Sequence, residues 1–415
     1  MMNNILHYTE KYGLLFVLLV CFSLLPPDLS KKLNMMSLDL NVFNENQSGS
    51  NIKKQLLWLL PLGIYFLSFI RITKPIRLNI KQHKIVINFL LIIFVLVISY
   101  LINGNSLLLK RIIFQIILSI VLFSAIYFSL IKKTTVICIN YLIITILSVC
   151  FLSLMLGTGY LDNSFCAWTQ TKNSLGSYLL AAILLLWYAK NYLPEYVFNY
   201  KIKLFLLILF LFLSLSKTTI LLSFIPMLFE VYRLKLNAKL LTYSVFILTS
   251  IFILIPAVAS FLETEWYIAL FMEPDTLTGR GLIWDVLYND LFQYDKLWVG
   301  YGYSSYFGTG TIPYSLDDSY SFIRFLNSAH NGYLELILQL GVILSSVIIF
   351  LVYKMIMTTK NTGVYLISLI IFLHNITESS LFRDQHIMWV TLITAICLGV
   401  LHKNQHKKFT YNKGN

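Results

Sequence analysis

Long runs of apolar residues, separated by short polar segments, follow one another along almost the whole chain. A bilayer core about 30 Å thick requires roughly 20 apolar residues to cross it as a helix. This pattern predicts an all-α polytopic membrane protein, with residues 1–415 forming a single integral membrane domain. Twelve runs of suitable length predict helices near 12–27, 56–70, 85–102, 112–131, 134–156, 174–189, 204–216, 218–231, 240–260, 333–353, 363–376 and 386–402.

Two interruptions of this pattern are informative. The seventh and eighth runs form one apolar stretch that is broken only at Ser214-Leu215-Ser216-Lys217, which predicts a tight reversal at the membrane surface. Residues 261–332 form a segment of about 70 residues between the ninth and tenth helices, far longer than an ordinary connection between helices. Within it, Asp285, Asn289 and Gln293 recur every four residues among apolar neighbours, so 281–293 is predicted to be a surface-lying helix.

Composition narrows the class of protein. A hydrophobic content of 58%, a charged content of 12% and a mean hydropathy of +0.74 exclude an ordinary soluble protein. Five cysteines in 415 residues do not make a disulfide framework. The net charge of +13 does not indicate nucleic-acid binding, because the basic residues are spread over many short clusters between apolar runs.

The basic residues instead indicate the topology. About 20 of the 32 fall on alternate connecting segments, as expected for cytoplasmic segments. With twelve crossings, this predicts that both termini are cytoplasmic and that 261–332 is a large periplasmic or extracellular loop. That loop holds nine of the nineteen acidic residues but only three basic ones, so each of its basic residues requires an explanation.

His330 is the first candidate for chemistry. It lies in Ser328-Ala329-His330-Asn331-Gly332, where the long segment enters the tenth helix. A histidine at the membrane face titrates near neutral pH and can meet a lipid-linked substrate, but a capping or loop histidine is an equally open interpretation. Gly341 lies eleven residues further on, about three helical turns away, and is expected on nearly the same face, in close packing beneath the site.

Cations near the predicted outer face are the second group of candidates. Arg280 starts the predicted surface helix, where a guanidinium and free backbone N–H groups favour an anion such as a diphosphate. The alternative is an interfacial arginine that pairs with Asp285 or with lipid headgroups. Lys217 lies at the predicted outer turn, where it is either an anion ligand or a lysine that extends its ammonium to the membrane surface. Lys172, before the sixth helix, is a weaker candidate of the same kind.

Three further features remain open or are disfavoured. Asp317-Asp318 does not indicate a metal site, because no further ligand lies beside the pair in the sequence. Glu335 and Gln339 are expected to mark an inward polar face. The aromatic segment 298–303 suits sugar stacking and a membrane-interface belt equally well. We therefore expect neither a metal ion nor another cofactor.

Together these segments resemble the O-antigen ligase and polymerase superfamily of bacterial envelope glycosyltransferases. His330-Asn331, nine residues and Gly341 are similar to the family's histidine signature, and Gly279-Arg280, Trp284 and Gly300-Tyr301-Gly302-Tyr303 are similar to its pattern in the large external loop. Residues 172–176 resemble the Asn-x-Leu-Gly opening of an earlier helix, and 213–222 resemble the Ser-Arg segment, with Lys217 in place of the usual arginine. The residue that closes the glycine pattern is Leu344, which is a second departure. The resemblance covers about 165–395.

The resemblance implies a GT-C-like, metal-independent, inverting transfer of a glycan from an undecaprenyl-diphosphate donor to a glycan or lipid acceptor, at the external face of a bacterial inner membrane. His330 would be the general base, and Arg280 and Lys217 would bind the diphosphate. Asn331 would orient the histidine or the sugar. Arg324 and Lys172 are further substrate-binding candidates.

Several functions remain open within and outside this family. The first choice is the polymerase that joins repeat units of O-antigen, capsule or exopolysaccharide, with a chain-length regulator as a candidate partner. The alternatives are a ligase that transfers polymer to the lipid A core and a protein O-oligosaccharyltransferase. A transporter or flippase of lipid-linked sugars belongs to a different class, and it is disfavoured because the two halves of the chain show no repeat and the candidate charges gather at one face.

Overall fold

The computed structural model describes residues 2–30, 52–70, 79–104, 106–161, 163–231, 238–270, 273, 280–307, 328–383 and 386–411. In these residues the fold is almost entirely helical, and the strands are one short hairpin, β1 (Tyr160–Leu161) and β2 (Ser164–Phe165). All twelve predicted apolar runs overlap with helices, and only the first, 12–27, extends well past the end of its helix at Cys21. These helices are α1 (Met2–Cys21), α3 (Ile52–Ile70), α4 (Ile80–Asn103), α5 (Ser106–Ile131), α6 (Thr135–Leu156), α7 (Lys172–Tyr192), α8 (Tyr200–Ser214), α9 (Lys217–Val231), α10 (Ala238–Phe261), α13 (Gly332–Thr359), α14 (Thr362–Thr377) and α15 (Ile387–Tyr411).

The helices form a multi-pass membrane bundle. Within the described residues, five segments are long and apolar enough to cross a bilayer, namely Ile80–Asn103, Leu108–Ile131, Thr135–Leu156, Thr242–Phe261 and Gly332–Thr359. Three shorter apolar helices accompany them. Large apolar side chains such as Phe94, Phe205 and Leu221 are exposed on the outside of the bundle, as expected of side chains that face lipid. The expected number of twelve crossings remains a prediction.

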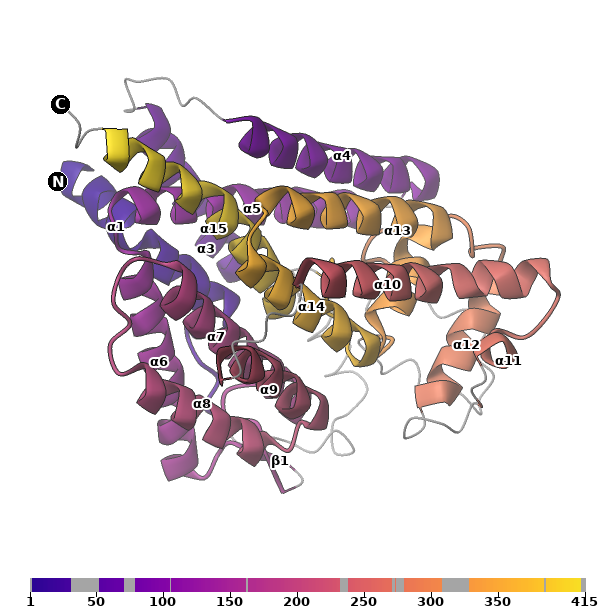
Figure 1. Cartoon of the computed structure of the whole chain (residues 1–415). Coiled ribbons are helices and arrows are strands. Elements are labelled where there is room, and N and C mark those ends of the chain that lie inside the picture. The colour runs from indigo at the N-terminus through magenta and orange to yellow at the C-terminus, as the bar shows by residue number, and fades with distance from the viewer. Residues whose placement is uncertain are drawn as a thin grey trace.

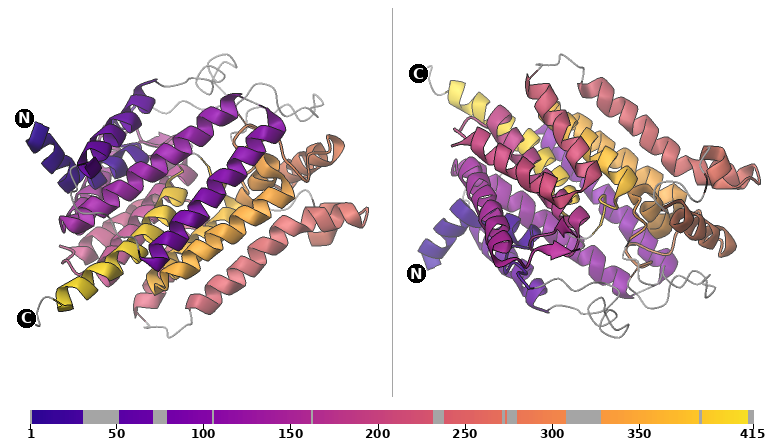
Figure 2. Two further views of the ribbon diagram at one scale, coloured as in Figure 1. Left: turned by 90° about the horizontal axis from the view of Figure 1, so that it is seen from above. Right: turned by 90° about the horizontal axis from the view of Figure 1, so that it is seen from below.

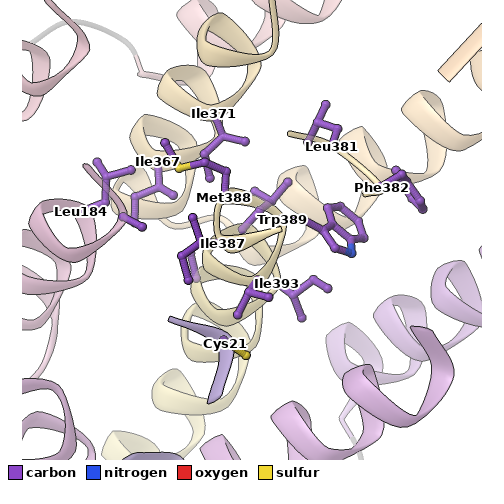
Figure 3. Packing of buried hydrophobic residues seen from close by; sticks show 14 of the residues in the cluster. Cys21, Leu184, Ile367, Ile371, Leu381, Phe382, Ile387, Met388, Trp389 and Ile393 are labelled. Carbon is purple, nitrogen blue, oxygen red and sulfur yellow. The ribbon is translucent and has the colours of Figure 1, made fainter. Parts of the chain in front are cut away.

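The core of the bundle is built from helices that are apolar on all sides. In α7 every side chain from Leu179 to Ala189 is at most 5% exposed, because α8, α9, α14 and α15 pack around it. Leu184 of α7 lies next to Ile367 of α14, in a cluster that continues to Ile371 of α14 and Met388 of α15 (Figure 3). α4, α13 and α10 run side by side along another part of the bundle (Figure 1). This core holds the ends of α7, α9 and α14 in fixed relative positions.

The predicted reversal between the seventh and eighth runs is confirmed as a break between two helices. α8 ends at Ser214, Leu215 adopts a left-handed backbone with φ 56°, and α9 begins at Lys217. The turn packs tightly against α7, because a Cβ added to Gly176 would lie 2.5 Å from Oγ1 of Thr219. The close approach sets the start of α7 beside the start of α9.

The tenth predicted helix, α13, is interrupted at Gly341. This residue has φ 68° and ψ 174°, which is not helical, and a Cβ there would lie 2.2 Å from the carbonyl carbon of Trp298. The expectation that Gly341 and His330 lie on one face of a continuous helix is therefore wrong. The glycine does mark close packing, but its neighbour is the backbone of a loop inserted at the break.

The inserted loop supplies the hydrogen bonds that the helix loses at the break. The N–H groups of Tyr301 and Gly302 donate to the carbonyls of Leu338 and Gln339, each at 2.8 Å, and the Val342 N–H donates to the carbonyl of Leu297 at 2.9 Å. Unpaired backbone groups are costly at membrane depth, so the loop and the break stabilise each other. The segment Gly300-Tyr301-Gly302-Tyr303 and the helix break at Gly341 thus form one structural unit.

The described parts of the long segment before α13 contain two helices, α11 (Trp266–Leu270) and α12 (Arg280–Gln293). They lie beyond the end of α10, toward the opposite end of the molecule from α1 and the last turns of α15 (Figures 1 and 2). α12 confirms the predicted helix, and Asn289 and Gln293 are exposed on it as expected. Most of its other side chains are buried, including Asp290, whose Oδ2 accepts hydrogen bonds from the Tyr301 and Tyr306 hydroxyls at 2.8 and 3.0 Å. α12 therefore packs into the protein and is not simply surface-lying.

Candidate functional site

Three segments that are distant in sequence meet at one carboxylate, Glu378, directly after α14. Its Oε1 accepts a hydrogen bond from Asn173 Nδ2 at 2.9 Å and forms an ion pair with Arg280 Nη2 at 3.0 Å. Its Oε2 lies 3.7 Å from Nδ1 of His330. The Arg280 guanidinium also donates from Nη1 to the carbonyl of Thr377. The structure thus brings together two of the residues that the sequence singled out, Arg280 and His330, through a third that it did not.

The charge of Glu378 is set by these neighbours. Burial acts to raise the pKa of its carboxyl, since only 16% of the side chain is exposed. The neighbouring His330 ring and Arg280 guanidinium act in the opposite direction and prevail, so the pKa lies below its ordinary value. Glu378 is therefore an anion at neutral pH.

The geometry of His330 determines which of its nitrogens can react. Nδ1 is buried and faces Glu378, with no hydrogen-bond partner among the described residues. One third of the side chain is exposed. Nε2 is accordingly the nitrogen left for a substrate, and the carboxylate behind the ring can stabilise the imidazolium that forms when Nε2 takes a proton.

The predicted cations Lys172 and Lys217 are the first residues of α7 and α9, and both are exposed. Hydrogen bonds place these helix starts beside the carboxylate, because Ser216 Oγ donates to Asn173 Oδ1 at 3.4 Å and Thr377 Oγ1 donates to Thr218 Oγ1 at 3.3 Å.

The starts of α7, α9, α12 and α13 therefore converge on the end of α14. Helix N-termini carry partial positive charge, so four of them with three cationic side chains form an anion-attracting region, in which the Glu378 carboxylate offsets one positive charge.

Asn331 has a structural task in addition to any role at the site. It is the N-cap of α13, and its Oδ1 accepts hydrogen bonds from the backbone N–H groups of Tyr333 and Leu334 at 2.9 and 3.2 Å. Its carbonyl oxygen is thus committed to the helix start, and the expected contact with the histidine or the sugar would fall to the amide nitrogen.

A buried polar network supports the segment that carries Glu378. The ring of His374 forms hydrogen bonds with Ser177 at 3.2 Å and with Ser380 at 2.6 Å. Oδ1 of Asn375 accepts from the backbone N–H groups of Ser380 and Leu381 at 3.0 and 2.9 Å. These bonds fix the turn that follows α14 and hence the direction of the carboxylate.

The aromatic segment 298–303 does not form the sugar-stacking platform that was one of its two interpretations. Tyr301 and Tyr303 are 7% and 0% exposed, and the Tyr303 hydroxyl donates to the carbonyl of Phe382 at 2.9 Å. Trp298 is exposed. The tyrosines pack the inserted loop against the turn after Glu378.

Several predicted residues lie outside the described part of the chain. Arg324 and the pair Asp317-Asp318 fall within 308–327, and Gly279 falls within 274–279. Among the described residues, no group of three or more histidine, cysteine or acidic side chains lies together as a metal site would require. The assignment of Arg324 to substrate binding stays a prediction.

Glu378, His374 and Asn375 were missed from the sequence. The available signal was an ionisable group directly after an apolar run, in His374-Asn375-Ile376-Thr377-Glu378, which repeats the His-Asn pair of the site. The rule that a charge at the bilayer face is functional would have selected Glu378. Only the fold shows that its partners come from segments 48 to 205 residues away.

Comparison with known protein families finds a match to part of the chain. Residues 202–349, from α8 to within α13, match the family model described as O-Antigen ligase, and this region includes Lys217, Arg280 and His330. This match supports the resemblance to the O-antigen ligase and polymerase superfamily. No curated protein and no solved structure matches the chain. The matched region lies in the middle of the chain, and Glu378, Asn173 and Lys172 lie on either side of it.

Proposed function

We propose that this protein is a membrane glycosyltransferase that polymerises undecaprenyl-diphosphate-linked repeat units of an O-antigen, capsule or exopolysaccharide. The observation that carries the proposal is the arrangement of Arg280, Glu378 and His330 among four helix N-termini. It combines a candidate base whose side chain is one third exposed with a site for a diphosphate, and these are the two requirements of transfer from a diphosphate-linked donor.

In the proposed reaction the acceptor hydroxyl gives its proton to Nε2 of His330, and its oxygen bonds to the anomeric carbon of the donor sugar. The bond between that carbon and the diphosphate oxygen breaks at the same time, and the electron pair leaves with the undecaprenyl diphosphate. A single displacement of this kind inverts the anomeric configuration. Glu378 stabilises the imidazolium by its negative charge, as a carboxylate behind a catalytic histidine does.

The diphosphate gains negative charge as it leaves, and the proposal assigns its stabilisation to Arg280, Lys217 and Lys172. Arg280 uses two of its five N–H donors on Thr377 and Glu378, and 22% of its side chain is exposed, which leaves donors for a phosphate oxygen. Lys217 and Lys172 add charge at the exposed starts of α9 and α7. In this scheme the side chains perform the electrostatic task, and the transfer requires no metal ion.

Ligation is the second candidate function, because the matching family model is described as an O-Antigen ligase. The same base and diphosphate site would serve a ligase or a protein O-oligosaccharyltransferase, since the three reactions differ in the acceptor and share the donor chemistry. The proposal also places the protein in a bacterial inner membrane, with cytoplasmic termini and an external active site. Cysteine labelling of Asn289→Cys from the periplasm and of Lys403→Cys from the cytoplasm tests that placement.

The deciding experiment is glycan transfer by the purified protein in nanodiscs, with undecaprenyl-diphosphate-linked repeat units as sole substrate, with and without EDTA. Chain growth that survives EDTA and is lost in His330→Ala supports the polymerase. Transfer that begins only when lipid A core or an acceptor protein is added indicates one of the two alternatives. If no acceptor supports transfer and His330→Ala instead loses translocation of lipid-linked sugar, the enzyme proposal fails in favour of a transporter. Addition of a chain-length regulator should change product length and leave the need for His330 unchanged.

A further inference from the structure

His330 has an unusual backbone conformation for a residue that carries out chemistry. Its φ is 50°, in the left-handed region, which residues with a side chain adopt infrequently and which the surrounding structure must impose. The residue sits between Ala329, which precedes it, and the N-cap Asn331. What holds these two neighbours therefore decides where the imidazole points.

Two buried side chains hold both sides of Ala329. The Ala329 N–H donates to Oε2 of Glu335 at 3.1 Å, and the Ala329 carbonyl accepts a hydrogen bond from Nε1 of Trp284 at 3.0 Å. Ala329 is 0% exposed, Trp284 is 3% exposed and Glu335 is 6% exposed. Water therefore does not replace these bonds readily, and the two peptide groups that flank Ala329, one of which also joins it to His330, are constrained.

The contact from Glu335 is not an ordinary helix cap. In a capping box the carboxylate of the third helical residue returns to the N–H of the N-cap itself. Glu335 is the fourth residue of α13 and reaches past the N-cap Asn331 to Ala329, on the far side of His330. Its other oxygen, Oε1, accepts only a long contact of 3.4 Å from Gln339, and no cation among the described residues pairs with the carboxylate.

Burying an acidic side chain without a cationic partner costs free energy. The presence of Glu335 at this position is therefore best explained by a role that uses its acceptor oxygens. We propose that Glu335 and Trp284 are positioning residues for His330, which clamp the peptide groups of Ala329 and so fix the left-handed backbone that aims Nε2 at the acceptor hydroxyl. This inference rests on the proposed function, in which Nε2 is the base. It gives Glu335 a task as a hydrogen-bond acceptor and assigns it no proton transfer.

Loss of either hydrogen bond to Ala329 should allow the imidazole of His330 to move away from its proposed position beside the acceptor hydroxyl. A displacement of about 1 Å at a reacting group can lower the rate about 10²-fold while substrate binding elsewhere is retained. We therefore expect Glu335→Ala to lower kcat by roughly 10- to 100-fold and to leave KM for the lipid-linked donor within about 2-fold. Glu335→Gln retains an acceptor oxygen and should keep kcat within about 3-fold of the wild-type value.

Trp284→Phe tests the other half of the clamp, because it removes the indole donor and keeps an aromatic ring in the core. We expect kcat to fall with KM nearly unchanged. Trp168→Phe is the matched control, since Trp168 is equally buried and its Nε1 donates to a buried carbonyl, that of Phe22, at 2.9 Å in another part of the molecule. If the loss of any buried hydrogen bond from an indole lowered activity, kcat would fall in both variants. The proposed role predicts that kcat falls only in Trp284→Phe.

The outcomes separate this inference from the proposed function. If His330→Ala keeps full transfer activity, His330 is not the base and both fail. If His330→Ala is inactive while Glu335→Ala and Trp284→Phe keep kcat, the clamp alone is overturned. The clamp is also overturned if Glu335→Gln loses as much activity as Glu335→Ala, or if the losses lie in KM. Should Glu335→Ala fail to fold, Glu335→Met and Trp284→Phe give the same comparison.

Discussion

Glu378 and Arg280 are 98 residues apart in the chain, yet Oε1 of the carboxylate lies 3.0 Å from Nη2 of the guanidinium. The pair joins the end of α14 to the start of α12 and sets the carboxylate behind His330. If the proposed function holds, this carboxylate stabilises the protonated base in the transition state. Glu378→Gln keeps the size and an acceptor oxygen but removes the charge. We expect it to lower kcat about 10- to 100-fold, as measured by single-turnover transfer in nanodiscs.

Asn173→Ala is the companion variant for this prediction. It removes a neutral donor to the same oxygen and leaves the charge in place. Its effect on kcat should be smaller than that of Glu378→Gln. An equal loss in both variants would show that the shape of the turn matters and the charge does not.

The lowered pKa of Glu378 predicts how stability depends on pH. A carboxyl whose pKa is lower in the folded state stabilises the fold above its unfolded pKa of about 4.3, and this contribution is lost as the pH falls through the folded pKa. The Tm of the wild type should exceed that of Glu378→Gln by a constant amount above about pH 5, and the gap should shrink below about pH 4. Thermal melts in nanodiscs between pH 7 and pH 3 measure the gap.

Glu263→Gln, at an exposed position after α10, serves as the control for these melts. Its Tm should follow the wild type throughout the range. A gap between wild type and Glu378→Gln that widens in acid would have the wrong sign and would refute the assigned charge state.

Lys217 tests the departure from the family pattern, in which an arginine is usual at this position. Lys217→Ala should raise KM for the diphosphate donor several-fold, because it removes one cation from the anion-attracting region. Lys217→Arg should match or improve on the wild type, since a guanidinium keeps the charge and binds phosphate in a bidentate manner. Donor titrations at two salt concentrations check both, and the alanine variant should show the weaker salt dependence. Equal KM values in all three proteins would remove Lys217 from the site.

A substitution at Gly341 tests whether the break in α13 is required for stability. Gly341→Ala places a Cβ 2.2 Å from the carbonyl carbon of Trp298 and requires alanine to adopt φ 68°. We expect a loss of at least about 2 kcal/mol in stability and a lower yield of folded protein.

Gly63→Ala is the matched substitution for Gly341→Ala, because Gly63 lies in α3 with nothing within 4 Å of its added Cβ. It should be neutral or stabilising by up to about 1 kcal/mol. Melting curves of the two variants in the same detergent make the comparison. A Gly341→Ala protein as stable as Gly63→Ala would mean that the break is not required.

Much of the fold could be predicted because apolar runs report helices directly. The runs locate the bundle helices, and the polar interruption at Ser214-Leu215-Ser216-Lys217 locates the turn between α8 and α9. The break at Gly341 could not be predicted, because a glycine within an apolar run is compatible with a continuous helix. Its conformation depends on Leu297 and Tyr301, which reach it only through the tertiary fold.

The candidate site could be predicted in part for a similar reason. Arg280 attracts attention because basic residues are scarce in the long acidic segment, and His330 because it is an ionisable group where that segment enters a helix. Glu378 does not, because its importance lies in the groups around it. Asn331 was expected to face the substrate, but the start of α13 takes its carbonyl oxygen. The local sequence shows which polar groups are present, but the tertiary packing determines which of them form hydrogen bonds with one another.

The loop inserted at Gly341 also bears on how this protein can be engineered. The backbone of 297–302 completes the hydrogen bonding of α13, so the segment between α10 and α13 cannot be exchanged independently of that helix. Replacing it with the corresponding segment of another enzyme would leave the carbonyls of Leu338 and Gln339 without donors at membrane depth. A chimera designed to change acceptor specificity would therefore have to replace the first half of α13 together with the segment.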